Sequence, residues 1–210
     1  ASARCKTPVT TNDLFSYELI EGGMHVTGCQ YDCPQNLVIP DVINGTSVIK
    51  ASGFHHSNLS SVSLPESITS LGNGAFTVNN LSQLTLPPNL IEIPDDAFKN
   101  NVLTSISIPS NVTHIGRFAF SSNRLTSVVI PDSVLSIGPR AFSYNFLSEV
   151  TLGAGLSSLS EYVFFQNELT YVHIPNTIKN IESGAFRFNS IDSVDFENGL
   201  ENISDDAFQR

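Results

Sequence analysis

The chain has 210 residues and a net charge of −10 at pH 7, and it contains no cluster of lysine or arginine. Nucleic acids and anionic membranes are bound by basic side chains that neutralise phosphates, so the sequence argues against nucleic-acid partners and against anionic membranes. No apolar run approaches the length of about 18 residues that a membrane-spanning helix needs, so we also expect no membrane insertion.

Charged residues make up 14% of the chain, compared with roughly 25% in a typical soluble protein. Serine, threonine and asparagine fill the surface that charged residues leave, which is common outside the cell. We therefore expect a secreted or cell-surface protein.

The first segment, residues 1–36, is predicted to be an arm followed by a hairpin. Residues 1–12 show no apolar period. Two strand-like runs, 14–20 and 24–27, flank Glu21-Gly22-Gly23. Adjacent glycines permit the positive φ of a tight turn, and we expect the hairpin to cap the open end of the fold that follows.

The three cysteines of the chain, Cys5, Cys29 and Cys33, all lie in this segment. In an exported chain they predict one disulfide that staples the N-terminal end, with the third thiol free or paired outside the chain. The sequence leaves open which two of the three cysteines form the disulfide. A metal site would need a fourth ligand, and His25 is the nearby candidate. We favour the disulfide and expect neither a metal nor another cofactor.

The rest of the chain, residues 37–210, repeats with a period of 22 residues. Each period is marked by a phenylalanine, usually preceded by alanine, and the series is Phe54, Phe76, Phe98, Phe120, Phe142, Phe164, Phe186 and Phe208. Apolar residues recur five, eight, ten, fourteen and seventeen positions after each phenylalanine. Positions eight and ten share one face of a strand, so each period has an apolar stripe that stacked neighbours must bury.

This period predicts a single continuous solenoid of about eight coils, mostly β, with a short helical turn around each phenylalanine. Glycine at position eighteen, as in Gly72, Gly116 and Gly138, is expected to open a corner through its backbone freedom. The first coil is irregular, because Pro40 lies 14 residues before Phe54 where later coils have 11. We expect the inserted residues to bulge as a loop around 43–46.

Asparagine stands three residues after most of the phenylalanines. The asparagines of this row are Asn79, Asn101, Asn123, Asn145, Asn167 and Asn189. A buried asparagine side chain both donates and accepts hydrogen bonds, so we expect one per coil to satisfy backbone groups left unpaired at the bend.

The combined pattern, L-x-x-V-x-I-P-x-x-V-x-x-I-G-x-x-A-F-x-x-N, resembles the BspA-like, or Treponema pallidum type, leucine-rich repeats. The last position, usually cysteine in that family, is asparagine here. The resemblance covers about residues 37–208 and implies a leucine-rich-repeat solenoid of the α/β repeat class. It also implies a secreted or surface protein, most often bacterial. Several members resemble adhesins that bind host matrix proteins.

The exposed strand positions, seven and nine after each phenylalanine, change in character along the chain. Early coils carry small hydroxyl or amide side chains, whereas later coils carry Ser127, Val129, Glu149, Tyr171, His173 and Asp195. Large amphipathic side chains commonly anchor contacts, so we expect these six residues to form a binding patch on the concave sheet. Random drift at exposed positions is the alternative interpretation.

We therefore predict a non-enzymatic, adhesin-like interaction module that binds a protein or glycan ligand. No Ser/His/Asp or Cys/His grouping, phosphate loop or carboxylate pair recurs at consistent coil positions to suggest catalysis. The recurrent Ser and Thr residues leave open a surface that binds a regular lattice, such as a polysaccharide or ice. A spacer role within a larger surface protein is a further alternative. The chain stops two residues after Phe208 without a capping element, so we also expect contact through this end or a longer natural protein.

Overall fold

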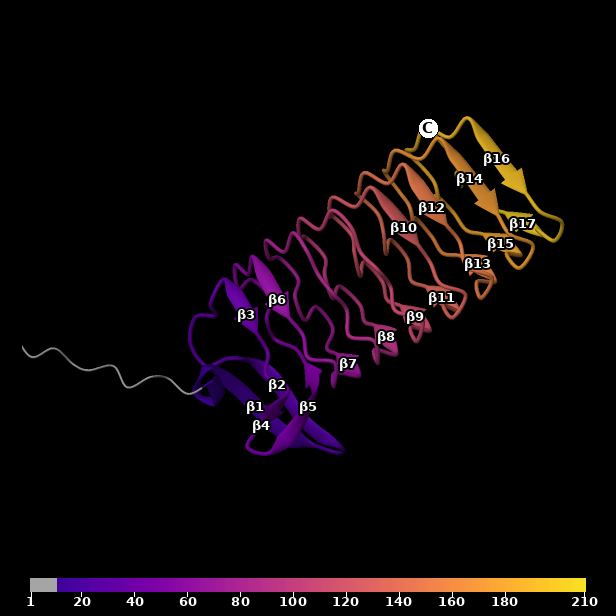
Figure 1. Ribbon diagram of the computed structural model, residues 1–210. Coiled ribbons are helices and arrows are strands. Elements are labelled where there is room, and N and C mark those ends of the chain that lie inside the picture. The colour runs from indigo at the N-terminus through magenta and orange to yellow at the C-terminus, as the bar shows by residue number, and fades with distance from the viewer. Residues whose placement is uncertain (1–10) are drawn as a thin grey trace, which may run out of the picture.

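In the computed structural model, which describes residues 11–210, coils of about 22 residues stack along one axis (Figure 1). The arrangement is almost entirely β and turn, and it confirms the predicted solenoid. One 3-10 helix, η1 (Thr11–Leu14), precedes the first strand. Each coil contributes apolar side chains to a core that runs the length of the stack.

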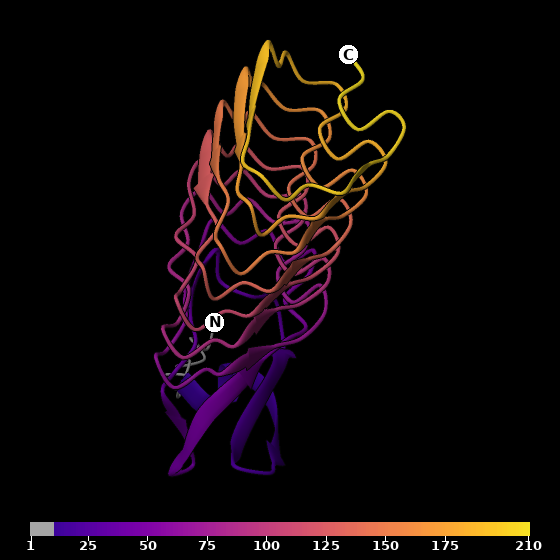
Figure 2. The same cartoon turned by 90° about the vertical axis from the view of Figure 1, so that its right-hand side faces the viewer.

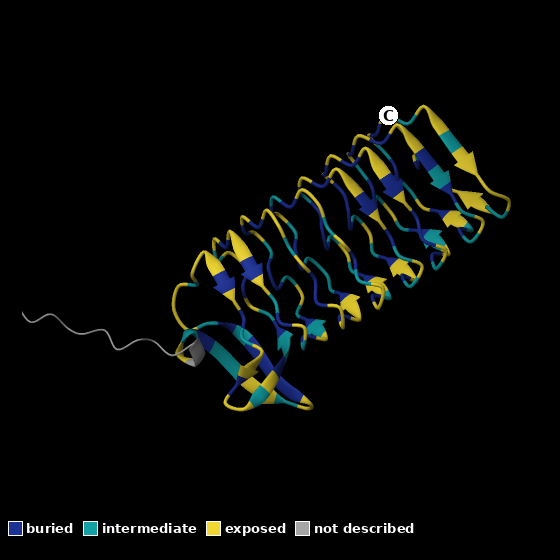
Figure 3. Ribbon diagram, in the orientation of Figure 1, coloured by how far each residue is buried: buried dark blue, intermediate teal, exposed yellow. Residues whose placement is uncertain are grey.

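The first row of strands coincides with the predicted apolar stripe. Its members are β3 (Asn36–Val38), β6 (Ser61–Ser63), β10 (Ser127–Val129), β12 (Glu149–Thr151), β14 (Tyr171–Ile174) and β16 (Ser193–Phe196). Neighbouring strands pair in parallel as β3–β6, β10–β12 and β14–β16. Along most of the row, buried and exposed residues alternate, as Figure 3 shows, so every second side chain points to solvent. We call the exposed side of this row the front face.

A second row of parallel strands lies on the other side of each coil, as Figure 2 shows. It consists of β7 (Ser70–Leu71), β8 (Glu92–Ile93), β9 (His114–Ile115), β11 (Ser136–Ile137), β13 (Ser158–Leu159), β15 (Asn180–Ile181) and β17 (Asn202–Ile203). Each strand ends on the apolar residue at position seventeen. Two-residue strands have no alternation to detect, so the sequence pattern predicted the buried residue here but not the strand.

Around each phenylalanine the chain forms consecutive β-turns, which corrects the expected short helical turn. Near Phe120, the N–H of Ala119 donates to the carbonyl of Gly116, and the N–H of Ser121 donates to that of Phe118. The residues two before and two after Phe120, Phe118 and Ser122, have φ of 55° and 57°. Right-handed helix geometry requires negative φ, so a left-handed residue on each side excludes a helical turn.

The phenylalanine rings stack into a continuous column. Consecutive rings from Phe54 to Phe208 lie 5.1–5.8 Å apart between centroids, with interplanar angles of 1–17°. Phe54 through Phe186 are fully buried, whereas Phe208 is partly buried. Phe15 from β1 (Phe15–Ile20) meets the first ring of the column edge-on at 6.4 Å, so the hairpin extends the core.

The asparagine row binds successive coils together. The Asn123 side chain is 5% exposed, and its Nδ2 donates to the carbonyl of Phe120 in its own coil and to that of Phe98 in the preceding one. Its Oδ1 accepts from the N–H of Leu103, also in the preceding coil. The other members of the row make the same three bonds.

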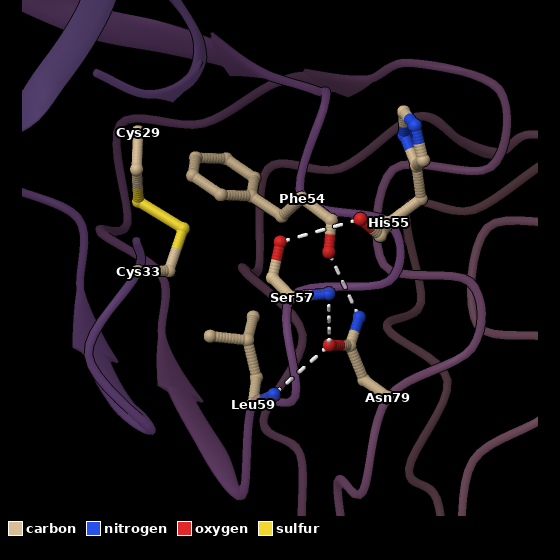
Figure 4. Close-up of a disulfide and its surroundings, with 7 residues drawn as sticks. All are labelled: Cys29, Cys33, Phe54, His55, Ser57, Leu59 and Asn79. Atoms are coloured by element: carbon tan, nitrogen blue, oxygen red, sulfur yellow. Dashed lines mark hydrogen bonds between the residues drawn. A yellow bond between two sulfur atoms is a disulfide. The ribbon is translucent and has the colours of Figure 1, made fainter. Parts of the chain in front are cut away.

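The first coil departs from this pattern because Ser57 stands where later coils have asparagine. Oδ1 of Asn79 then accepts from the N–H of Ser57 as well as from that of Leu59, as Figure 4 shows. The neighbouring coil therefore supplies the hydrogen-bond acceptor for a backbone group of this bend.

The glycines at position eighteen are needed because neighbouring coils pack closely there, and not because the backbone adopts a conformation that only glycine favours. Their φ angles are not in the left-handed region. A Cβ atom placed on Gly116 would lie 2.5 Å from the backbone nitrogen of Asp95, and one on Gly138 would lie 2.5 Å from that of Arg117. Any side chain there would push neighbouring coils apart, which corrects the expected reason for glycine at this corner.

At the N-terminal end, β1 pairs antiparallel with β2 (Gly23–Cys29), and β2 pairs in parallel with β5 (Thr46–Ala51), which in turn pairs with β7. The hairpin thus continues the second row of strands. The expected loop in the first coil is a second hairpin, in which β4 (Val42–Ile43) pairs antiparallel with β5. Asn44 and Gly45 both have positive φ, which suits a two-residue hairpin turn.

A disulfide joins Cys29, at the end of β2, to Cys33 in the loop before β3, with the Cα atoms 5.5 Å apart (Figure 4). This staple lies at the predicted end of the molecule. Cys5 lies outside the described residues.

The asparagine bridge generates the first prediction. Asn123→Ala removes three hydrogen bonds and leaves a buried N–H and two carbonyls without that partner, so the free energy of unfolding should fall by about 3 kcal/mol. Asn111→Ala is the control, because its exposed side chain donates one bond to the Pro88 carbonyl, and its effect should stay within about 0.5 kcal/mol. Urea unfolding followed by circular dichroism measures both. If the free energy of unfolding falls no more in Asn123→Ala than in Asn111→Ala, the asparagine bridge adds no stability beyond that of one exposed hydrogen bond.

The left-handed turn residues generate the second prediction. Val78 has φ of 53°, which is unfavourable for a β-branched residue, and the next coil has Asn100 at the same position. Val78→Asn should raise the free energy of unfolding by about 1 kcal/mol, because asparagine tolerates this conformation. Val129→Asn makes the same change in a strand and should give no gain. A stabilisation at both positions would indicate a general effect of surface polarity instead.

Candidate binding surface

Four neighbouring strands, β10, β12, β14 and β16, carry all six predicted binding residues on the front face (Figure 1). Ser127 is paired with Glu149, and Val129 with Thr151, in the β10–β12 register. Tyr171 and His173 follow on β14. The side chains of Val129 and Tyr171 are 62% and 50% exposed. The fixed period thus aligns the six residues in two adjacent columns that run across the coils.

His173 lies between two carboxylates. Its Nδ1 is 2.9 Å from Oδ2 of Asp195, which is its register partner on β16, and its Nε2 is 3.3 Å from Oε1 of Glu197. The backbone N–H of Asn176 donates to Oε2 of Glu197 at 2.9 Å, which helps to hold that carboxylate. These side chains fix the orientation of an imidazole beside the exposed ring of Tyr171.

Glu197 is a member of this cluster that the repeat pattern did not indicate. It follows the last residue of β16, Phe196, at position eleven after Phe186, where most coils have proline. The replacement of proline by glutamate at this position could have indicated that Glu197 belongs to the patch. A charged residue at the end of an exposed strand lies beside the ninth position of the same strand, which here is Asp195.

The patch is acidic, and Tyr171 is the aromatic anchor among its six predicted residues. Strands β10, β12, β14 and β16 contain no lysine or arginine. Asp195 and Glu197 place carboxylates beside His173, and Glu149 occupies the same position of the repeat as Tyr171 in the preceding coil. The surface is therefore suited to a partner that offers cations next to apolar groups.

The other end of the front face has a different shape. A hollow of about 410 Å³ lies between the first two full coils and is lined by Ser61, Ser63, Gln83 and Thr85 among others. Residues 83–85 and 105–107 are not paired as strands within the described part of the chain. The small side chains expected there from the sequence thus border an opening in the front row rather than a flat sheet.

A hydrogen-bonded trio around the buried His25 joins the hairpin to the first coil. Nδ1 of His25 on β2 lies 2.9 Å from Oε1 of Glu18 on β1, and Nε2 lies 2.8 Å from Oγ of Ser52, just after β5. Both ring nitrogens are therefore engaged. Gly72 of the next coil packs so closely on Ser52 that an added Cβ would lie 2.6 Å from the serine Cβ. We interpret the trio as a structural link.

Residues 11–210 contain no group of three or more His, Cys, Asp or Glu side chains that could hold a metal ion. Among the same residues, no helix is long and apolar enough to cross a membrane.

Comparison with known proteins supports the pattern and the fold. Residues 29–124 and 113–210 match the family model described as "BspA type Leucine rich repeat region (6 copies)". A search of curated proteins finds no match.

Solved structures include several similar solenoids. The leucine-rich repeat protein of T. pallidum superposes with a TM-score of 0.68 and 27% identity, over 87% of this chain and 88% of that one. A leucine-rich repeat protein from Bacteroides ovatus gives 0.66 and 18%, over 85% and 56%. A leucine rich cell surface protein from Faecalibacterium prausnitzii gives 0.65 and 22%, over 92% and 56%. The chain thus spans little more than half the length of the last two proteins.

The exposed cluster generates the third prediction. His173→Ala should change the free energy of unfolding by less than about 1 kcal/mol, because ion pairs on the surface contribute little to stability. Ile174→Ala in the same strand removes a fully buried side chain and should cost about 2–5 kcal/mol. Thermal and urea unfolding of both variants provide the comparison. A large loss at His173 would show that the cluster is a structural element rather than a free binding surface.

Proposed function

Because this chain belongs to the family of BspA type leucine-rich repeat proteins, we propose that it is an extracellular, adhesin-like module that binds a partner protein through its front face. The observation that carries the proposal is the exposed Tyr171 ring beside an oriented His173, on strands whose register is fixed by the repeat. Tyrosine brings a large contact area at little cost in conformational entropy, which suits it to anchoring an interface.

The charge of the patch favours a basic partner. Glu149, Asp195 and Glu197 provide three carboxylates and the patch strands no cation, so a lysine or arginine of the partner would find charge complementarity around Tyr171. Such complementarity steers association and selects partners more than it adds affinity. The proposed partner is therefore a host or matrix protein with exposed cationic residues.

Three observations support an extracellular site of action. The Cys29–Cys33 disulfide is typical of oxidising compartments. The chain has a low fraction of charged residues. The similar protein from F. prausnitzii is described as a cell surface protein. Lattice binding is less favoured, because Val129, Tyr171 and His173 interrupt the array of hydroxyl groups.

The fourth prediction tests this function. The intact chain should bind at least one member of an array of immobilised extracellular matrix proteins, more tightly at low salt than at high salt. A Tyr171→Ala/His173→Ala variant should lose at least ten-fold in affinity, since it removes the aromatic anchor and the oriented imidazole. Surface plasmon resonance measures both affinities.

The matched control is a Ser61→Ala/Gln83→Ala variant, which alters the other end of the front face and should bind like the parent chain. The thermal unfolding of each variant verifies its fold. Binding that survives the Tyr171/His173 change, or that the control loses equally, contradicts the proposed site. Absence of binding to basic matrix proteins contradicts the proposed class of partner.

A further inference from the structure

The bends around the phenylalanines carry a row of stacked aromatic and cationic side chains, which we call the turn edge. It begins at Phe118, whose ring lies 4.2 Å from Nζ of Lys99 and 5.5 Å from the guanidinium carbon of Arg117. Arg140 comes next, 5.9 Å from the ring of Phe118 and 4.6 Å from that of Tyr162. One guanidinium therefore links rings from two different coils.

The row continues through a cluster of four rings. Phe165 lies 5.4 Å from Tyr162, 5.3 Å from Tyr144 and 5.3 Å from Phe188 between ring centroids. Arg187 then lies 4.9 Å from Phe188. Tyr144 and Phe188 are 42% and 45% exposed, so part of the aromatic surface is open to solvent.

Several of these side chains occupy backbone positions that disfavour them. Phe118, Arg140 and Tyr162 lie two residues before the buried phenylalanine, with φ of 55–59°. At the same position two other coils have glycine, Gly74 and Gly184, which adopts this conformation without strain. A bulky residue in the left-handed region costs stability, so glycine would be the less strained choice at this position.

Two of the four cations in the row have no ion pair and no side-chain hydrogen bond among the described residues. Lys99 is paired with Asp96 and Arg187 faces Asp206. The guanidinium groups of Arg117 and Arg140 make no ion pair or side-chain hydrogen bond within residues 11–210. Stacking on a ring uses the flat face of a guanidinium and leaves the N–H groups on its edge free for a carboxylate or sulfate.

From this geometry we propose that the turn edge binds a linear acidic polysaccharide, separately from the front face. The apolar faces of pyranose rings would stack on Tyr144 and Phe188, and their carboxylate or sulfate groups would accept from Arg117 and Arg140. Stacked coils present these groups at a repeat of about 4.8 Å, which suits a ligand that also repeats at short intervals. Four of the ten lysine and arginine residues of this acidic chain lie in the row, at Lys99, Arg117, Arg140 and Arg187.

The test is isothermal titration calorimetry of the intact chain at low salt against three probes of matched length: an oligogalacturonate, a heparin oligosaccharide and a neutral dextran oligosaccharide. At least one acidic probe should bind and dextran should not, and the better acidic probe identifies carboxylate or sulfate as the preferred group. Arg140→Ala should weaken that binding at least ten-fold. Tyr162→Gly should do the same, and glycine fits the left-handed backbone there, so the fold should be retained.

Two controls keep the result specific. Arg124→Ala changes the net charge as much as Arg140→Ala does, but Arg124 takes no part in the row, so its affinity should stay within two-fold of the parent. The Tyr171→Ala/His173→Ala variant should also bind the acidic probe normally, which separates this surface from the protein-binding proposal. The inference is overturned if neither acidic probe binds, if dextran binds equally well, or if a control variant loses as much affinity as Arg140→Ala.

Discussion

The structure depends on the hydrogen bonds that each buried asparagine makes across a bend. A coil that turns back on itself leaves backbone N–H and carbonyl groups in an apolar interior, where an unpaired group is costly. Asn123 and its equivalents satisfy three such groups at once, two of them in the preceding coil. The same contact therefore closes the bend and fixes the spacing to the next coil, and the phenylalanine column fills the space inside.

The fixed register of the coils determines which residues are neighbours on the surface. Because every coil is aligned at its bend, residues that are 22 apart in sequence become neighbours in space, as His173 and Asp195 do. The core and the asparagine bridges hold this alignment from inside the solenoid. Exposed positions are thus free to vary, and a patch on one face requires only suitable residues at one position of successive coils.

Much of the fold was predictable from the sequence, and the features that the sequence did not predict have physical reasons. The phenylalanine and asparagine rows followed from their period. The second row of strands did not, since a pair such as Ser70–Leu71 is too short to show alternation. The paired left-handed turns were also missed, because the usual signals for positive φ are glycine and asparagine, and here Phe118, Arg140 and Tyr162 take that conformation. Reading those bends as helical hid the fact that their side chains share one edge.

The turn edge also bears on how far the net charge of a solenoid can indicate its partners. A value of −10 argues against anionic ligands only if charge is spread evenly. In a solenoid each position of the repeat forms its own strip of surface, and exposed charges farther apart than the screening length of about 8–10 Å interact little at physiological salt. The carboxylates beside His173 lie on the front face and the Arg140 guanidinium beside Tyr162 lies on the turn edge, so each surface has its own local charge. Each strip of the surface can therefore suit a partner of different charge.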